Sequence, residues 1–327
     1  MHKLMNDYLL GVEIGGTKLQ LAIGDESGRL LHVEQGRVKA GDGARGILLW
    51  LENNIPGVIA KSRDFGGRIA GIGVGFGGPV ETSTGRVLAS MQIHGWENFK
   101  IRNWFEDKFK LPAVVNNDSN AACWGEYRNG FGAGTSNFCY MNIGSGIGGG
   151  LVIEGRLHDG QGFGAAEFGH TYVPDWTVGD VPGAAQKLEL LCSGWSIEQR
   201  LRRPGYVPER SALMRMCCGE IGAISCATLG AAAEGDDDFA KAEIDRVARS
   251  VAIVLSSVLA IICPERIAMG GGVSGLGEIL LAPLRAHLKK YEFINSSGRY
   301  ELEKCRLDES IVLVGAILLL KDRLARA

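Results

Sequence analysis

Apolar and polar residues alternate in two short segments of the chain that resemble each other. Residues 9–23 and residues 138–153 each consist of an apolar strand, a glycine-rich turn and a second apolar strand. Alternation on both sides of glycines is typical of a β-hairpin. A further strand is expected at residues 29–35, so the first hairpin opens an antiparallel meander, and the second hairpin opens a similar one.

Longer apolar patterns predict the other elements. Buried strands are expected at residues 69–76, 113–115 and 266–269. Helices are expected at residues 44–63 with an interruption at Pro56, and at residues 119–127, 211–234, 239–263, 275–291 and 311–327. The order of meander, helix and strand occurs twice, which predicts an α/β protein built from two related domains.

The two domains are expected to meet near Asp118, because no linker rich in proline, serine or charge separates the halves. Residues 1–118 would form the smaller domain and residues 119–310 the larger one. The last helix, at residues 311–327, is long enough to cross back onto the first domain. A boundary of this kind predicts that the two domains are joined at a hinge and not by a flexible linker.

Composition and charge restrict the class of protein. A chain of 327 residues with 46% hydrophobic and 22% charged residues is long enough for two globular domains. The net charge of -2 shows no excess of the positive charge that binds phosphate backbones, so no nucleic-acid partner is expected. The longest apolar stretches, 251–263 and 311–320, are shorter than the about 20 residues of a membrane-spanning helix, so no membrane partner is expected either.

The start of the chain and its cysteines indicate the compartment. Residues 1–7 contain no apolar segment of signal-peptide length, which favours a cytoplasmic location. The eight cysteines show no C-x-x-C spacing and lie mostly in apolar or helical sequence. We interpret them as reduced thiols that serve as small core residues.

The two glycine turns are candidate phosphate-binding loops. Glycines at such turns let the backbone adopt positive φ and bring bare N–H groups close to an anion, and a hydroxyl group adds a donor. Two ordinary tight hairpins would show the same glycines, but the repetition favours a pair of loops that hold a polyphosphate from both sides. The residues concerned are Gly15, Gly16 and Thr17 in the first turn, and Gly144, Ser145 and Gly146 in the second.

Charged groups beside these loops suit phosphoryl transfer, which needs a phosphate cradle, a metal ion and a carboxylate beside the attacking hydroxyl. Asp118 follows a buried strand and could accept the hydroxyl proton, although an aspartate before a helix is also a favoured N-cap. Glu13, on the first strand, could hold Mg²⁺ through water, or it could be a solvated edge residue. Lys18 could neutralise phosphate or simply be solvated.

Glu167 and His170 place a carboxylate and an imidazole close together in a glycine-rich segment. Such groups suit the capture of vicinal hydroxyls of a sugar. A histidine with a purely structural role is the more frequent case, so this pair indicates a sugar-binding site only together with other motifs.

The motifs taken together resemble the ROK family of repressors, open reading frames and sugar kinases. They occur in order over nearly the whole chain, at residues 13–18, 75–80, 117–122, 144–150, 167–170 and 270–273. The resemblance implies a two-domain actin-like, hexokinase-type (ribonuclease H-like) fold that closes over sugar and ATP. It also implies a glucokinase-like transfer of the γ-phosphate to a hydroxyl, commonly the 6-hydroxyl, of a hexose or N-acylhexosamine.

The resemblance also implies roles for individual residues. Asp118 matches the catalytic base of the family, and Asn117 matches its sugar-binding neighbour. The phosphate loops match at the six turn residues named above, and Gly271 and Gly272 match the turn beside the adenosine. The other positions that match sugar-binding residues are Gly78, Glu167, His170 and Glu189.

Two departures from the family pattern matter. The family usually has a zinc site after the histidine, but its cysteine positions are occupied by Asp180, Pro182 and Lys187. Proline and lysine cannot serve as zinc ligands, so no structural zinc is expected, and packing or hydrogen bonds must hold this loop instead. In addition, Glu13 stands where aspartate is usual, which keeps the charge of a magnesium site but lengthens the side chain.

Two functions therefore compete. The first is an ATP-dependent hexose kinase that uses Mg²⁺, and the second is a sugar sensor or regulator without catalysis. Repressors of the family carry an added helix-turn-helix domain, for which the first strand near residue 8 leaves no room. The intact Asp118 favours the kinase, and the resemblance also implies a possible homodimer.

Overall fold

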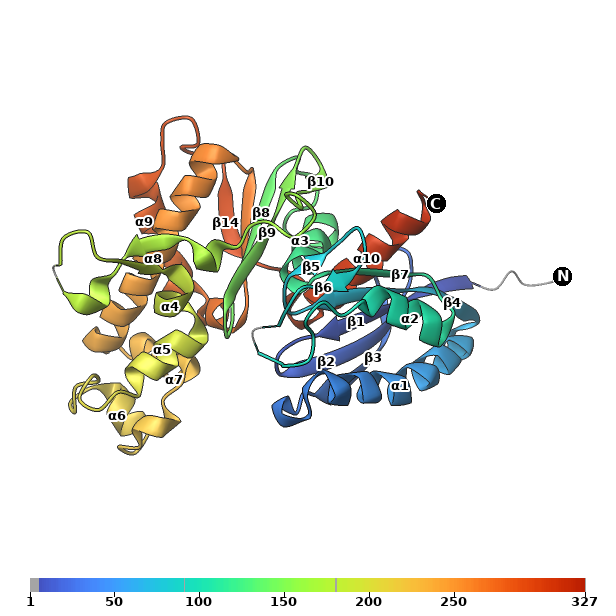
Figure 1. Ribbon diagram of the computed structural model, residues 1–327. Coiled ribbons are helices and arrows are strands. Elements are labelled where there is room, and N and C mark those ends of the chain that lie inside the picture. The colour runs from blue at the N-terminus through green and yellow to red at the C-terminus, as the bar shows by residue number, and fades with distance from the viewer. Residues whose placement is uncertain (1–5, 91, 180, 327) are drawn as a thin grey trace.

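The computed structural model describes residues 6–90, 92–179 and 181–326. Within these ranges the chain forms two five-stranded sheets and two short two-stranded hairpins. The sheets lie in separate halves of the molecule, and helices α3 and α10 lie between them (Figure 1).

The first sheet has the strand order β3-β2-β1-β4-β7, in which β1, β2 and β3 are antiparallel and β1, β4 and β7 are parallel. Its strands are β1 (Asn6–Ile14), β2 (Lys18–Gly24), β3 (Leu30–Arg37), β4 (Gly67–Phe76) and β7 (Ala113–Asn117). Because β1 lies in the middle of this sheet, residues on it are shielded by strands on both sides.

The second sheet repeats this arrangement with the order β10-β9-β8-β13-β14 and the same strand directions. Its strands are β8 (Phe138–Ile143), β9 (Ile147–Ile153), β10 (Arg156–Leu157), β13 (Arg266–Gly270) and β14 (Glu301–Lys304). The prediction of two related α/β halves, each opened by a glycine-turn hairpin, is confirmed. The short hairpins pair β5 (Val80–Glu81) with β6 (Arg86–Val87), and β11 (Tyr172–Pro174) with β12 (Ala185–Lys187).

Helices cover the sheets and form two large apolar cores, one in each half. The helices of the first half are α1 (Gly43–Lys61) and α2 (Ile101–Phe109), and α3 (Asp118–Asn129) follows β7. Those of the second half are α4 (Leu188–Cys192), α5 (Gly194–Leu201), α6 (Ala212–Met216), α7 (Cys226–Glu234), α8 (Asp238–Ile261) and α9 (Glu278–Tyr291). The chain ends in α10 (Ile311–Leu324). None of the helices in the described part combines the length and apolar content that a bilayer crossing requires.

Two expectations about helices are wrong. The helix predicted at residues 211–234 is broken, because Gly219 takes a φ of 80° after α6 and a capping box between Ser225 and Thr228 starts α7. The interruption predicted at Pro56 does not occur. Pro56 lies on the exposed side of α1, while the fully buried Leu51 and Ile55 hold the helix against the first core.

The C-terminal helix α10 returns to the first half, where it packs on β1 and β4, and its other side packs on α3 (Figure 1). Glycines make these contacts close. A Cβ on Gly315 would stand 1.7 Å from the carbonyl oxygen of Ala121 in α3, and a Cβ on Gly73 would stand 2.1 Å from the carbonyl oxygen of Ala316. The backbone of α10 is therefore wedged between the first sheet and α3, and α3 in turn packs on β8 and β9 of the second sheet.

Replacing Gly315 with alanine should test this wedge. We expect Gly315→Ala to lower the free energy of unfolding by about 3 kcal/mol, because the added methyl group meets backbone that cannot move aside. Gly57→Ala is the matched control, since Gly57 is an exposed position of α1 where a Cβ meets no heavy atom within 4 Å. The control should gain about 0.5–1 kcal/mol from helix propensity. Equal stabilities of the two variants in denaturant titrations would contradict the close packing.

Candidate active site

Asp118 lies where β7 ends and α3 begins. The N-cap of α3 is Asn117, whose side-chain oxygen accepts hydrogen bonds from the backbone N–H groups of Ser119 at 2.9 Å and Asn120 at 3.1 Å. The interpretation of Asp118 as the N-cap is therefore wrong. The amide nitrogen of Asn117 donates to the carbonyl of Gly78 at 3.1 Å, so this side chain joins the loop after β4 to the start of α3.

The Asp118 carboxylate is anchored on one side. Its Oδ1 atom accepts a hydrogen bond of 2.7 Å from the N–H of Ser119, whereas no described residue donates a hydrogen bond to Oδ2. Burial raises the pKa of Asp118 to about 6, with hydrogen bonds from Ser119 acting in the opposite direction and the negative charge of Glu167 adding to the rise. At neutral pH the carboxylate is mainly ionised, and Oδ2 is the atom available to take a proton.

A cavity of about 510 Å³ opens beside Asp118 and is lined by residues from both halves of the chain. Glu13 and Lys18 line it from the first hairpin, and Gly271 and Gly272 line it from the end of β13. Its other polar lining residues are Ser119, Tyr140, Asn142, Lys304, Asp308 and Glu309. Five residues predicted from separate motifs thus share one cavity.

Glu13 lies on the central strand β1, so the alternative of a solvated edge residue is wrong. Its side chain is 13% exposed, and among the described residues its Oε2 atom has no hydrogen-bond partner. Burial raises the pKa of Glu13 to about 7, which Lys18 opposes and Asp118 reinforces. The Lys18 ammonium stands 3.9 Å from Glu13 and forms a closer ion pair of 2.7 Å with Glu309. The carboxylate of Glu13 is therefore short of a positive partner.

Backbone hydrogen bonds close both glycine turns, from Gly15 to Lys18 at 3.0 Å and from Gly144 to Gly146 at 2.9 Å. The predicted positive φ is wrong for Gly15, Gly16, Gly144 and Gly146, all of which have other backbone conformations. The exposed residues Thr17 and Ser145 occupy the tips of the turns.

Two of the turn glycines are closely approached by side chains from other segments. A Cβ on Gly16 would stand 1.3 Å from the Gln92 side-chain oxygen, and a Cβ on Gly146 would stand 2.6 Å from the Glu189 carboxylate, so a larger residue at either position would displace that side chain. Positive φ does occur at Gly271, at 83°, where the chain turns after β13. The adjoining Gly272 has open space around the Cβ position, because no heavy atom lies within 4 Å.

The predicted sugar-binding residues form a second group around the second turn. Glu189, on α4, accepts a hydrogen bond of 2.8 Å from the backbone N–H of Ile147, directly after the turn. Glu167 precedes the short helix η3 (Phe168–His170). Burial raises the pKa of the Glu167 carboxyl, the charge of His170 opposes this, and Glu189 adds to it. Because Glu167 also acts on the pKa of Asp118, the two groups of residues are within electrostatic reach of each other.

The segment that aligns with the family's zinc loop folds as the hairpin of β11 and β12. Asp180 lies outside the described residues, and Pro182 is exposed between the two strands. The Lys187 ammonium donates a hydrogen bond of 3.2 Å to the Nδ1 atom of His170. Lys187 therefore contacts the histidine directly.

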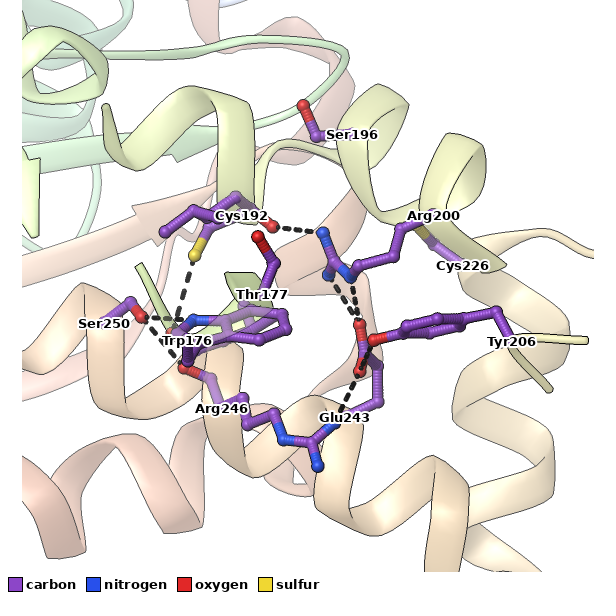
Figure 2. Close-up of polar contacts among 12 residues, drawn as sticks. Trp176, Thr177, Cys192, Ser196, Arg200, Tyr206, Cys226, Glu243, Arg246 and Ser250 are labelled. Carbon is purple, nitrogen blue, oxygen red and sulfur yellow. Dashed lines mark hydrogen bonds and ion pairs between the residues drawn. The ribbon is translucent and has the colours of Figure 1, made fainter. Parts of the chain in front are cut away.

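Trp176, in the short helix η4 (Trp176–Val178), anchors this hairpin to the second half of the molecule. Its ring lies 4.6 Å from the guanidinium of Arg200 and 5.6 Å from that of Arg246, and its Nε1 atom donates to Ser250 at 3.1 Å (Figure 2). Cation–π contacts of this kind and one hydrogen bond therefore hold the loop against α5 and α8.

The Trp176 ring rests on a buried ion pair between Arg200 of α5 and Glu243 of α8, at 2.5 Å (Figure 2). Their side chains are 3% and 0% exposed, and Tyr206 donates a further hydrogen bond of 2.9 Å to Glu243. Arg200 also donates to the carbonyl of Leu191 on α4, at 2.9 Å. The network therefore connects the hairpin to the helix that carries Glu189.

Several residues near the site were not found from the sequence. Gln92, from the loop after β6, covers the first turn, and Lys304 at the end of β14 and Asp308 and Glu309 after it reach the cavity. No motif marks these positions, because the last three approach the site through the pairing of β13 with β14 and Gln92 through its own loop. Trp176 was also missed, and nothing in its neighbours along the chain signals the two arginines that flank it.

The comparison with known families agrees with the motifs and the geometry. The ROK family model matches residues 9–323. The chain belongs to the ROK family. It is similar to a glucokinase of Halalkalibacterium halodurans, with 27% identity over 97% of this chain and 96% of the relative. It is also similar to the solved ROK family glucokinase of Streptomyces griseus in complex with glucose and AMPPNP, with 30% identity, a TM-score of 0.78, and coverage of 95% of this chain and 98% of the other.

Regulators of the ROK family are similar to the chain as well. A xylose repressor of Caldicellulosiruptor bescii is 25% identical over 97% of this chain and 79% of the repressor. The fold is that of the actin-like ATPases, in agreement with the two repeated sheets. Membership of the ROK family therefore establishes the fold, while kinases and repressors both remain among the relatives.

Asp118→Asn should stabilise the protein at alkaline pH. At pH 8 the carboxylate is ionised in the folded and unfolded states, and its burial opposes folding; asparagine removes the charge and keeps an oxygen for the N–H of Ser119. We expect a gain of about 1–2 kcal/mol at pH 8. The gain should shrink as the pH falls from 7 to 4, because the folded wild type takes up a proton near pH 6, above the ordinary value of 3.8. Thermal unfolding across this pH range measures the difference, and a less stable variant at pH 8 would contradict the raised pKa.

Proposed function

We propose that the protein is an ATP-dependent sugar kinase that transfers the γ-phosphoryl group to a hydroxyl, in the first instance the 6-hydroxyl, of a hexose or an N-acylhexosamine. One arrangement supports this function above all: Asp118, whose Oδ2 atom receives no hydrogen bond from a described residue, lines the same cavity as Glu13, Gly271 and Gly272. Phosphoryl transfer requires a proton acceptor, a carboxylate free to hold a metal ion and a turn that receives phosphates, and Asp118, Glu13 and the glycine turn supply these groups in one cavity.

Asp118 orients the attacking hydroxyl and takes its proton. Its Oδ1 atom stays bonded to Ser119 while Oδ2 accepts the hydroxyl hydrogen, so that the sugar oxygen bonds to the γ-phosphorus as the bond to ADP breaks. A pKa of about 6 leaves the base ionised at neutral pH and keeps its protonated form accessible after transfer.

The sugar is proposed to lie between the loop after β4 and the group formed by Glu167, His170 and Glu189. Asn117 supports this placement, because its amide bonds to Gly78 and fixes the loop next to the start of α3. Glu189 accepts a hydrogen bond from the N–H of Ile147 with one oxygen, so it holds the second turn in place and its other oxygen is left for a sugar hydroxyl.

Mg²⁺ fits the site at Glu13. Its Oε2 atom is buried without a hydrogen-bond partner among the described residues, and Mg²⁺ in kinases is held by one or two carboxylates together with waters and substrate phosphates. When bound, the ion neutralises charge on the phosphates of ATP. Glu13 would hold it, and Lys18 would lie beside the phosphates.

We further propose that residues 1–118 with 311–327, and residues 119–310, are the two units that close over these substrates. The packing of α10 on β1 and β4, and of α3 on β8 and β9, supports this division. A hinge at the junction of β7 and α3 would move Asp118 least, because it lies at the junction itself.

An ADP-release screen over hexoses and N-acylhexosamines tests the proposal. We expect ADP formation that depends on one of these sugars, and Asp118→Asn should lower kcat by about 100- to 10,000-fold because the base is lost. Asp107→Asn is the matched control, since Asp107 is exposed on α2 and forms no ion pair with a described residue. It should retain the wild-type rate.

The same screen distinguishes the kinase from a regulator. A protein that binds a sugar in calorimetry but forms no ADP with any sugar of the panel would be a sensor, and the kinase proposal would be wrong. An Asp118→Asn variant with full activity would leave the fold assignment intact but remove Asp118 from the mechanism.

Glu13→Gln tests the magnesium site. We expect the Mg²⁺ concentration for half-maximal rate to rise about tenfold, because the amide has no charge to attract the ion. Glu13→Asp keeps the charge and should stay close to the wild type. Glu209→Gln is a second control, because Glu209 is exposed, lies outside the lining of the cavity and forms no ion pair with a described residue. Equal magnesium dependence of Glu13→Gln and the wild type would contradict the assignment.

A further inference from the structure

The contact between Lys187 and His170 concerns a residue to which the proposed function gives no role. Lys187 Nζ lies 3.2 Å from His170 Nδ1. The pairing of β11 with β12 sets this distance, since Tyr172 faces Lys187 across the ladder and Leu188 donates a hydrogen bond of 2.9 Å to the carbonyl of Thr171. The hairpin register therefore brings the two side chains together.

The chemistry of the two groups fixes the direction of this hydrogen bond. A lysine ammonium has three N–H donors and no acceptor, so the imidazole nitrogen must accept with its lone pair. A neutral imidazole that accepts at Nδ1 carries its proton at Nε2. Lys187 thus selects one of the two tautomers and leaves Nε2–H as the donor.

We propose that Lys187 is a positioning residue that holds His170 in the Nε2–H tautomer, so that the imidazole donates a hydrogen bond to an oxygen of the bound sugar. This inference rests on the proposed sugar site for its ligand, but the tautomer itself does not depend on it. A group that bonds to one imidazole nitrogen orients the ring and defines what the other nitrogen does.

Two further observations support the assignment. Lys187 forms no ion pair with a described residue, so no described carboxylate draws its ammonium away from His170. The hairpin that carries Lys187 is anchored by Trp176, whose ring contacts the guanidiniums of Arg200 and Arg246 (Figure 2). Lys187 also directly precedes α4 and lies two residues before Glu189, so one backbone segment positions a donor group and a carboxylate for the same ligand.

Long-range ¹H–¹⁵N correlation spectra of protein with ¹⁵N-labelled histidine measure the tautomer. The unliganded full chain is examined at pH 8, and the His170 signals are assigned by their loss in His170→Gln. We expect an Nε2–H tautomer in the wild type and in Lys187→Arg, which keeps a cationic donor. In Lys187→Met we expect the Nδ1–H tautomer to appear, because the lone pair has lost its donor.

Sugar affinity is the second measurement, by calorimetry with the sugar that the ADP screen identifies or, without turnover, with each sugar of the panel. Lys187→Met should raise the sugar Kd about tenfold, while the Kd for ATP and kcat stay within about twofold. Lys187→Arg should stay near the wild type. Lys290→Met is the matched control for the loss of one exposed lysine, and it should change neither the spectra nor the Kd.

The outcomes separate this inference from the kinase proposal. An Nδ1–H tautomer in the wild type, or unchanged spectra and sugar Kd in Lys187→Met, would overturn the role of Lys187 even in an active kinase. A lower melting temperature of Lys187→Met without those changes would show a structural role only, and would overturn the inference as well. Absence of ADP formation with the expected tautomer and Kd changes would reject the kinase and retain Lys187 as the residue that positions His170.

Discussion

The close crossing of α3 and α10 is the contact on which the rest of the structure depends. Gly315 lets the backbone of α10 touch that of α3, and Gly73 lets the same helix lie directly on the first sheet. Since α3 packs on β8 and β9, the crossing sets the spacing of the two halves. A side chain at either glycine would push the halves apart, because the neighbouring atoms are backbone carbonyls and have no other rotamer.

This spacing places the candidate active site. Asp118 is the first residue of α3, so its carboxylate sits where the two halves meet, and the cavity beside it takes its walls from both sheets. The raised pKa values of Asp118 and Glu13 have the same origin, since burial at this junction removes water from both carboxylates. Carboxylates with raised pKa values are typical of functional sites, and this pair is consistent with the proposed roles of Glu13 and Asp118.

The hairpin of β11 and β12 is held at one point and meets His170 at another. Trp176 holds it through contacts with the guanidiniums of Arg200 and Arg246, beside a buried ion pair. Lys187 faces His170 with a positive group. A lysine supplies one charge and a directional donor, and Trp176 supplies the separate anchor of the loop.

The sequence by itself determined the repeated α/β halves, the hairpins and the position of Asp118 after a buried strand, because apolar periodicity and glycine turns are local signals. It also contained the break before α7, in the capping box of Ser225 and Thr228, which the helical pattern concealed. Only the tertiary structure decided that Gln92 and Glu189 approach Gly16 and Gly146, that Glu13 is central and its Oε2 atom lacks a hydrogen-bond partner among the described residues, and that Lys187 meets His170. These features depend on side chains from distant segments that approach one another through strand pairing and helix packing, and no local pattern records such distances.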